Sequence, residues 1–337
     1  MCKLVTFFDS VISGGPEQDI SSQVFAFEIL YSLAVPAFFL LIDCASLFPY
    51  SGLLSIGIPL ITGIAYQLKT GGLILPIYYL FSLMAKTTAR VNGKPTVRPH
   101  IRHVQGAFLA IIIGLVVPTM IVLFNPTPYI IALWQLFPVY IAILQSLFRF
   151  VYPPTPSSRG PTQRIAGKLP GAQTYLFIQF SYVILSSVGT LGHLPFLLSL
   201  ISDNPFNLTS SFSPAVSPGV DLTLNRVLTT LTATFKPHLG PFEYSTGQET
   251  LRSAIQDGSK RFLQWDEIFI SLSTWLVACW SWAFDDIKHF VVAVFGSIVS
   301  AFLFGPAIGL AGPLMYKEWI DEQIRVKAAA KPAEKKE

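Results

Sequence analysis

The chain has 337 residues, of which 52% are hydrophobic and only 12% are charged, and its mean hydropathy is +0.55. Charged residues make up about a quarter of a soluble domain, so this composition argues against a soluble protein and for one embedded in a membrane. The net charge of +4 is interpreted as setting the orientation in the membrane. It does not indicate nucleic-acid binding, because the basic residues are not interleaved with base-stacking aromatic residues.

Apolar runs of about 20 residues, the length that crosses a bilayer, predict an all-α integral membrane protein with about seven or eight transmembrane helices. The expected spans are residues 24–43, 49–66, 71–86, 104–124, 129–150, 172–200, 262–283 and 289–314. The second and third are short enough to form a re-entrant hairpin instead. Prolines inside these runs leave backbone groups that neighbouring helices or a water-filled cavity must satisfy, so the kinked bundle has room for a pocket.

These spans divide the chain into five segments. They are an N-terminal segment at 1–23, transmembrane helices one to six at 24–201, a lumenal loop or cap at 202–261, transmembrane helices seven and eight at 262–316, and a basic, disordered tail at 317–337. The apolar part of the N-terminal segment is too short for a cleaved signal peptide. We therefore expect the first span to target the chain to the membrane.

Basic residues orient the chain. The loops at 86–102 and 149–168 are rich in lysine and arginine, which places both on the cytosolic side. The segment 202–260 is then lumenal, as in a multi-pass protein of the endoplasmic reticulum, and Asn207 of the sequon Asn207-Leu208-Thr209 is a predicted glycosylation site.

The basic tail conflicts with this count, because three single crossings after the second basic loop would leave it in the lumen. We expect Gly305-Pro306 and Gly312-Pro313 to break the last apolar run into a short hairpin that returns the tail to the cytosol.

Polar residues inside spans are costly and therefore mark candidate functional positions. In the sixth span they recur at helical spacing on one face, at Tyr175, Gln179, Tyr182, Ser186, Gly189 and His193. The seventh span repeats that spacing with Glu267, Ser271, Thr274, Ala278, Ser281 and Asp285, flanked by Trp275 and Trp282. The antiparallel order of consecutive spans puts His193 and Glu267 at the lumenal end.

The first span adds Glu28 at the lumenal depth and Asp43 at the cytosolic depth, where Asp285 and Tyr175 are also expected. These positions predict an aromatic, polar-lined cavity with carboxyl groups at both ends.

Structural explanations compete with each of these assignments. Small and hydroxyl-bearing residues let helices approach closely and bond across the interface. Glu28 and Glu267 are compatible with snorkelling or helix capping, and Asp285 with a solvated helix exit. His193 is compatible with a bond to a carbonyl freed by Pro195, and Asp266, which faces about 100° away from Glu267, with a cap.

Motifs for nucleotides, metals, dinucleotides and haem are missing from the sequence, as are the paired aspartate motifs of membrane prenyltransferases, and Cys2, Cys44 and Cys279 are scattered. We therefore expect no cofactor and no metal. Proton chemistry remains: burial raises the pKa of a carboxyl group and keeps it protonated, as a general acid requires. Tryptophan and tyrosine faces stabilise a developing cation.

In length, span layout and the stretches LWQLFPVYIAILQ at 133–145 and FLQWDEIFISLSTW at 262–275, the chain resembles the fungal membrane-bound terpene cyclases of meroterpenoid pathways, which include the ascochlorin and macrophorin cyclases. This resemblance implies protonation of a terminal epoxide or olefin on a prenyl chain attached to an aromatic or quinone head, followed by ring closure. It assigns no catalytic residue.

Together these observations lead to one hypothesis with named roles. Glu267 is the acid, tuned by His193 or Glu28, and Trp275, Trp282 and Tyr182 line the cation's path. Asp285 or Asp43 is the final base or holds the polar head, and the two ends are interchangeable. Tyr175 and Gln179 complete the predicted substrate-binding set.

The expected partners are a prenylated small molecule and the lipid bilayer, with no nucleic acid. The alternatives are a transporter of a small hydrophobic metabolite, a non-catalytic membrane scaffold, and another enzyme acting on prenylated substrates.

Overall fold

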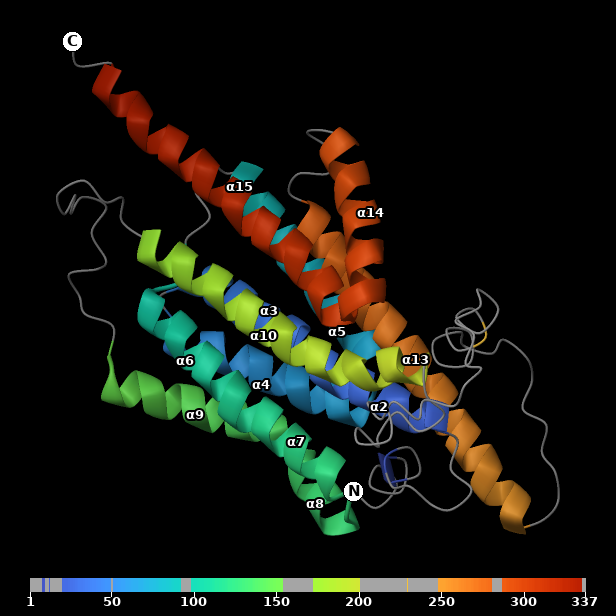
Figure 1. The fold of residues 1–337 in the computed structure, drawn as a ribbon. Coiled ribbons are helices and arrows are strands. Elements are labelled where there is room, and N and C mark those ends of the chain that lie inside the picture. Colours follow the sequence, from blue (N-terminus) through green and yellow to red (C-terminus); the bar gives the residue numbers. More distant parts are fainter. Residues whose placement is uncertain are drawn as a thin grey trace, which may run out of the picture.

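The computed structural model describes residues 8, 9, 12, 20–49, 51–91, 98–153, 172–200, 229, 248–280 and 287–334. Throughout these residues the regular structure is helical, as the apolar periodicity predicted (Figure 1). The helices from the N-terminus to the second basic loop are α2 (Ile20–Ser32), α3 (Ala34–Leu47), α4 (Gly52–Leu68), α5 (Gly71–Val91), α6 (Ile101–Ile111), η1 (Ile112–Val116), α7 (Val117–Phe124), α8 (Pro128–Trp134) and α9 (Phe137–Val151). After it come α10 (Ala172–Ser199), α13 (Gln248–Trp280), α14 (Ile287–Phe304) and α15 (Pro306–Glu334).

Several helix starts follow from local side-chain chemistry. The Ser51 hydroxyl accepts from the backbone N–H of Leu54 at the start of α4, and Thr127 accepts likewise from Ile130 at the start of α8. The ring Nδ1 of His100 accepts from the N–H of Arg102 before α6. Each bond satisfies one of the N–H groups that the first helical turn leaves without a partner.

Helices α2, α3 and α10 lie between two groups of helices (Figure 1). On one side α6 packs against α9, and α3 contacts α6. On the other side α13 packs against α5, and α14 packs against α15. Helix α10 contacts both α2 and α15, so the polar faces expected on the sixth and seventh spans lie in a helix-packed core.

Three helical stretches among the described residues are long and apolar enough to cross a membrane: Val24–Leu47, Ile101–Phe124 and Ala172–Leu198. The pair Pro128–Trp134 and Phe137–Val151, bent by 47°, makes a fourth as either a broken span or a re-entrant loop. The expected seven or eight crossings are therefore not confirmed.

The remaining expected spans, at 49–66, 71–86, 262–283 and 289–314, are not confirmed as crossings. Gly52–Leu68 and Phe290–Phe304 are apolar but shorter than the others, and at about 1.5 Å per residue they do not cover a hydrocarbon core of about 30 Å. Helix α13 begins at Gln248, well before the predicted boundary at 262, and its first half is polar and charged.

The last apolar run reverses direction at Gly305, where α14 ends and α15 begins. Gly305 has φ +97°, a left-handed conformation that a side chain disfavours. The second expected break is wrong, because α15 continues through Gly312-Pro313. Helix α15 extends to Glu334, so the segment from 317, which we expected to be disordered, is helical as far as that residue.

Candidate functional site

Glu28 of α2 and His193 of α10 form a buried pair. The ring Nδ1 of His193 lies 2.7 Å from Oε2 of Glu28, and its Nε2 lies 2.9 Å from the carbonyl oxygen of Phe302. A carbonyl oxygen only accepts, so Nε2 carries a hydrogen and donates it. Nδ1 and Oε2 then share one further proton, which makes the pair either a carboxylic acid bonded to neutral imidazole or a carboxylate bonded to imidazolium.

The turn at Gly305 closes over this pair. A Cβ at Gly305 would lie 2.9 Å from Cβ of His193 and 3.1 Å from Oε1 of Glu28. Oε1 has no hydrogen-bond partner among the described residues. The backbone at this turn therefore approaches the pair closely, and only glycine combines the positive φ with that approach.

Glu267 of α13 lies beside the same face of α2. Its Oε1 is 3.3 Å from the hydroxyl of Ser32, one helical turn from Glu28, and the Glu267 side chain is only 7% exposed. We call Glu28, Ser32, His193 and Glu267 the acid cluster. No lysine or arginine pairs with either of its carboxyl groups within the part of the chain that the structure describes.

Two buried carboxyl groups on neighbouring helices, Glu28 on α2 and Glu267 on α13, cannot both ionise cheaply without a cation. The acid cluster therefore suits carboxyl groups that keep and exchange protons. The sequence singled out three of its members but not Ser32, whose hydroxyl links α2 to α13. The signal for Ser32 was its position four residues after Glu28 in a predicted span.

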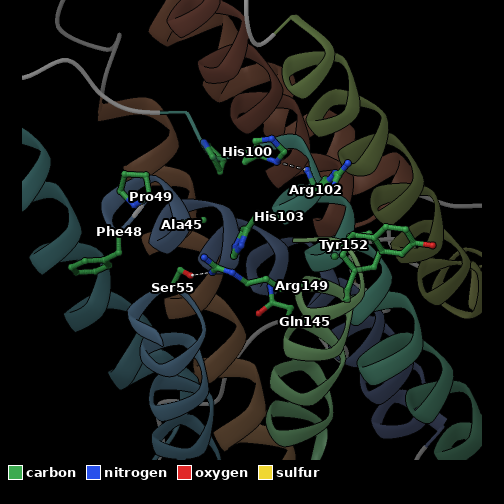
Figure 2. A pocket seen from close by; sticks show the side chains of 13 residues that line it. Ala45, Phe48, Pro49, Ser55, His100, Arg102, His103, Gln145, Arg149 and Tyr152 are labelled. Carbon is green, nitrogen blue, oxygen red and sulfur yellow. Dashed lines mark hydrogen bonds between the residues drawn. The ribbon is translucent and has the colours of Figure 1, made fainter. Parts of the chain in front are cut away.

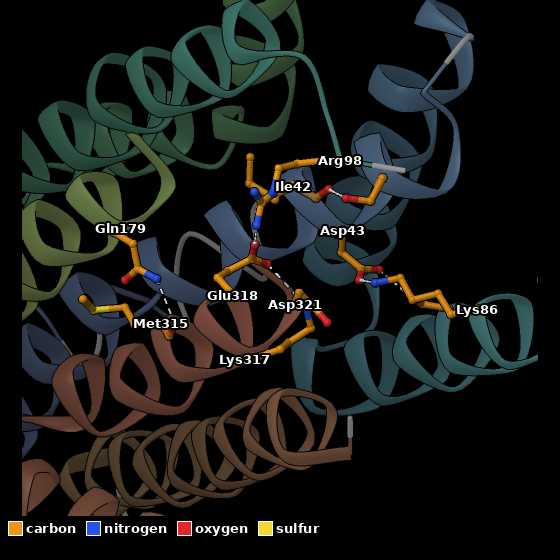
Figure 3. A network of polar contacts seen from close by, with 11 residues as sticks. Ile42, Asp43, Lys86, Arg98, Gln179, Met315, Lys317, Glu318 and Asp321 are labelled. Carbon is orange, nitrogen blue, oxygen red and sulfur yellow. Dashed lines mark hydrogen bonds and ion pairs between the residues drawn. The ribbon is translucent and has the colours of Figure 1, made fainter. Parts of the chain in front are cut away.

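Asp43 is in a different environment. It accepts hydrogen bonds from Tyr78 and Ser82 of α5. It also forms an ion pair with Lys86 of the same helix (Figure 3). Asp43 lies about 22 Å further along the span than Glu28, at about 1.5 Å per residue. The structure therefore does not bring Asp43 to the acid cluster.

Further charges surround the Asp43 end of the bundle. Arg98 forms ion pairs with Glu322 at 2.5 Å and with Glu318 at 3.7 Å, and Lys317 pairs with Asp321 at 2.9 Å (Figure 3). Burial opposes the charged form of Lys317, but the neighbouring carboxylates of Glu318 and Asp321 outweigh it and raise the pKa of Lys317 above its ordinary value. With Asp43 and Lys86, we call these residues the ionic network.

The predicted substrate-binding residues on α10 make contacts between helices. Tyr182 is fully buried and packs edge-on against Phe38 with ring centroids 5.3 Å apart. The Gln179 amide donates to the carbonyl of Met315 at 2.8 Å. The ring of Tyr175 lies under the Arg98 guanidinium, 5.5 Å from Cζ to the ring centroid.

On α13 the indole of Trp275 donates to the hydroxyl of Ser297 at 3.1 Å, and the hydroxyl groups of Thr274 and Tyr79 share a hydrogen bond at 3.2 Å. Asp266 accepts from the Thr70 hydroxyl and the N–H of Gly72 at the start of α5, so its interpretation as a cap is confirmed. These contacts favour a packing role for the hydroxyl positions.

Four predicted residues lie outside the described residues: Asn207, Ser281, Trp282 and Asp285. In the described part no group of three or more His, Cys, Asp and Glu side chains is arranged to hold a metal ion.

The model of one protein family, the CtvD domain, matches residues 1–316. No curated protein and no solved structure matches the chain.

Proposed function

The chain belongs to the CtvD family, and we propose that it is a membrane-bound terpene cyclase. The family is named after a protein of a biosynthetic gene cluster and is related to secondary metabolism. The proposed substrate is a farnesyl-type prenyl chain attached to an aromatic or quinone head. The enzyme would protonate its terminal epoxide or olefin and so start a cation cyclisation of a meroterpenoid.

The observation that carries this proposal is the acid cluster. Glu267 is buried, its one hydrogen bond among the described residues joins it to Ser32, and no cation faces it there. A carboxyl group in such a place is held as a neutral acid, which is the form that gives a proton to an epoxide oxygen or an alkene carbon.

The proposed reaction then proceeds in three steps. Glu267 donates its proton to the epoxide oxygen, the bond from that oxygen to the tertiary carbon breaks, and a hydroxyl group and a carbocation form. The electron pair of a neighbouring alkene makes the new carbon–carbon bond, and a base finally removes a proton. The product is an isomer of the substrate, so no oxidant or cofactor is needed.

Glu28 and His193 have a supporting role in this proposal. They share a proton one helical turn from Ser32, which suits them to restore the proton that Glu267 gives away. Tyr182, Trp275 and Trp282 remain proposed contacts of the cation. For the final base we retain Asp285, because Asp43 is held by Lys86.

The test is conversion of a farnesylated phenol and its terminal epoxide by microsomes that contain the chain, followed by mass spectrometry. We expect a product of unchanged mass and altered retention, which is absent with Glu267→Gln. Asp43→Asn is the matched control, since it also replaces a buried carboxylate by an amide. Equal losses in the two variants, normalised to folded protein, would argue against Glu267 as the acid.

A membrane scaffold is the second candidate, and the contacts of Gln179 and Thr274 between helices favour it. It predicts that substitution of Glu267 lowers the stability of the protein and changes no small molecule. The transporter alternative predicts movement of a metabolite across liposomes without chemical change.

A further inference from the structure

A cleft at the end of α3, far from the acid cluster, carries an unbalanced positive charge (Figure 2). The end of α3, the start of α4, the start of α6 and the end of α9 line it. Its polar side chains are Ser55, His100, Arg102, His103, Gln145 and Arg149. No aspartate or glutamate is among its lining residues. We call it the basic cleft.

Neither arginine of the basic cleft is neutralised by a carboxylate within the described chain. Arg149 donates to the hydroxyl of Ser55 at 3.3 Å, and Arg102 donates to the carbonyl oxygen of Pro153 at 2.7 Å. Both arginines lie on the lining of the cleft (Figure 2). Both acceptors are neutral. This contrasts with Arg98, which pairs with Glu318 and Glu322.

Two helix N-termini add to the positive potential of the cleft. Helix α4 begins at Gly52 and α6 at Ile101, and the first turns of both helices line it. The Arg149 guanidinium lies so close to Gly52 that a Cβ there would be 2.5 Å from its Cζ. A guanidinium beside the positive end of a helix is unfavourable unless an anion lies between or beside them.

Buried polar atoms at the cleft also lack partners. Gln145 is only 4% exposed, and neither its amide nitrogen nor its amide oxygen has a hydrogen-bond partner among the described residues. The same holds for Nε2 of His103. Buried polar groups are normally satisfied. The Gln145 amide nitrogen is a donor and fits a ligand that accepts hydrogen bonds, whereas the amide oxygen accepts, and Nε2 of His103 does either according to its tautomer.

From this arrangement we propose that the basic cleft binds an oxyanion, a carboxylate or phosphate group. Arg149, Arg102 and the amide of Gln145 would donate to its oxygens, and the helix N-termini would stabilise its charge. Phe48, Phe148 and Tyr152 on the lining fit an anion attached to an apolar body.

An oxyanion attached to an apolar body could come from two sources. The headgroup of an anionic phospholipid is one, since the cleft lies next to the basic loops expected at the cytosolic leaflet. A soluble molecule with an acidic group is the other. The proposal goes beyond the cyclase assignment and does not depend on it, because none of the acid-cluster residues lines the cleft.

The test measures thermal unfolding of the purified full chain in neutral detergent. One arm adds inorganic phosphate or acetate, and the other adds short-chain phosphatidic acid, with phosphatidylcholine as the neutral control. We expect the anions to raise the unfolding temperature of the wild type. In Arg149→Gln the apparent affinity should fall at least about tenfold, as when hydrogen bonds to a charged group are lost.

Lys69→Gln is the matched control, because Lys69 is an exposed lysine at the opposite end of α4. Gly52→Ala is a second variant that keeps all charges but displaces the Arg149 guanidinium, and it should also weaken anion binding. Without anion, Arg149→Gln should unfold at the same or a higher temperature than wild type, because it relieves the repulsion at α4.

A response to phosphatidic acid alone supports the lipid headgroup, and a response to phosphate as well supports a soluble anion. If anions stabilise Arg149→Gln, Gly52→Ala and Lys69→Gln equally, or do not stabilise the wild type, the proposal is overturned.

Discussion

The acid cluster and the ionic network lie at opposite ends of the same apolar span, Val24–Leu47, and both contain a fully buried carboxyl group. At the Asp43 end, Lys86 supplies a cation and Tyr78 and Ser82 supply hydrogen bonds. At the Glu28 end the partners are His193, Ser32 and a second carboxyl group, Glu267.

We propose that this difference separates a carboxylate with a structural role, Asp43, from carboxyl groups with a chemical role, Glu28 and Glu267. A buried carboxylate that is paired and hydrogen-bonded is stable as an anion and holds helices together. Buried carboxyl groups without a lysine or arginine partner, one of which shares a proton with a histidine, can change protonation state. We therefore expect substitutions at the Asp43 end to change stability, and those at the Glu28 end to change turnover.

The largest expected effect is on activity at Glu267. Glu267→Gln keeps the shape of the side chain and removes the acidic proton, so turnover should fall by about 10² to 10⁴-fold, the usual contribution of a general acid. Product formation by mass spectrometry measures the loss, and the unfolding temperature should stay close to that of the wild type. A drop in unfolding temperature with unchanged turnover per folded molecule would assign Glu267 to packing.

The next largest effect is on stability at Lys86. Lys86→Met leaves Asp43 buried without its cation, which should cost about 3 kcal/mol or somewhat more. Thermal unfolding of the purified protein in detergent measures this loss of stability. The double variant Lys86→Met with Asp43→Asn should recover part of the loss, because the uncompensated charge is gone. Lack of recovery would mean that Lys86 does not act through Asp43.

Gly305→Ala tests whether the close approach of the Gly305 turn to His193 and Glu28 matters for the acid cluster. The substitution forces a side chain into a left-handed conformation, at a cost of about 1 to 2 kcal/mol, and pushes it against His193 and Glu28. We expect both stability and turnover to fall. Gly296→Ala on α14, where a Cβ has open space, is the control. It should leave turnover unchanged and raise stability slightly, because alanine favours a helix interior over glycine.

The smallest expected effect is at Ser32. Ser32→Ala removes one hydrogen bond to Glu267, worth about 1 kcal/mol, so turnover should fall about fivefold while the unfolding temperature changes little. Ser273→Ala is the matched control, because that hydroxyl on α13 bonds only to the backbone carbonyl of Ile270 among the described residues. Equal effects of the two substitutions would leave Ser32 without a role at Glu267.

Much of the local structure could be predicted from the sequence. The helical character of the chain follows from the length and apolarity of its runs, and the polar faces of 172–200 and 262–283 follow from helical spacing. Glu28, His193 and Glu267 stood out because charged and polar groups inside apolar runs are costly. These features depend on neighbouring residues in the sequence, and sequence alone contains them.

Pairing between distant helices was decided only by the tertiary structure. Lys86 was interpreted as a loop charge that sets orientation, yet it neutralises Asp43. Arg102 and Arg149 were interpreted in the same way, yet they line a cleft with unpartnered polar atoms.

The number of crossings likewise depended on the tertiary structure, which sets where α4, α13 and α14 begin and end. The sequence determined which residues are too polar for their surroundings. Which partner, if any, compensates each of them follows from helix packing, because charges far apart in the chain meet only when the helices that carry them lie side by side.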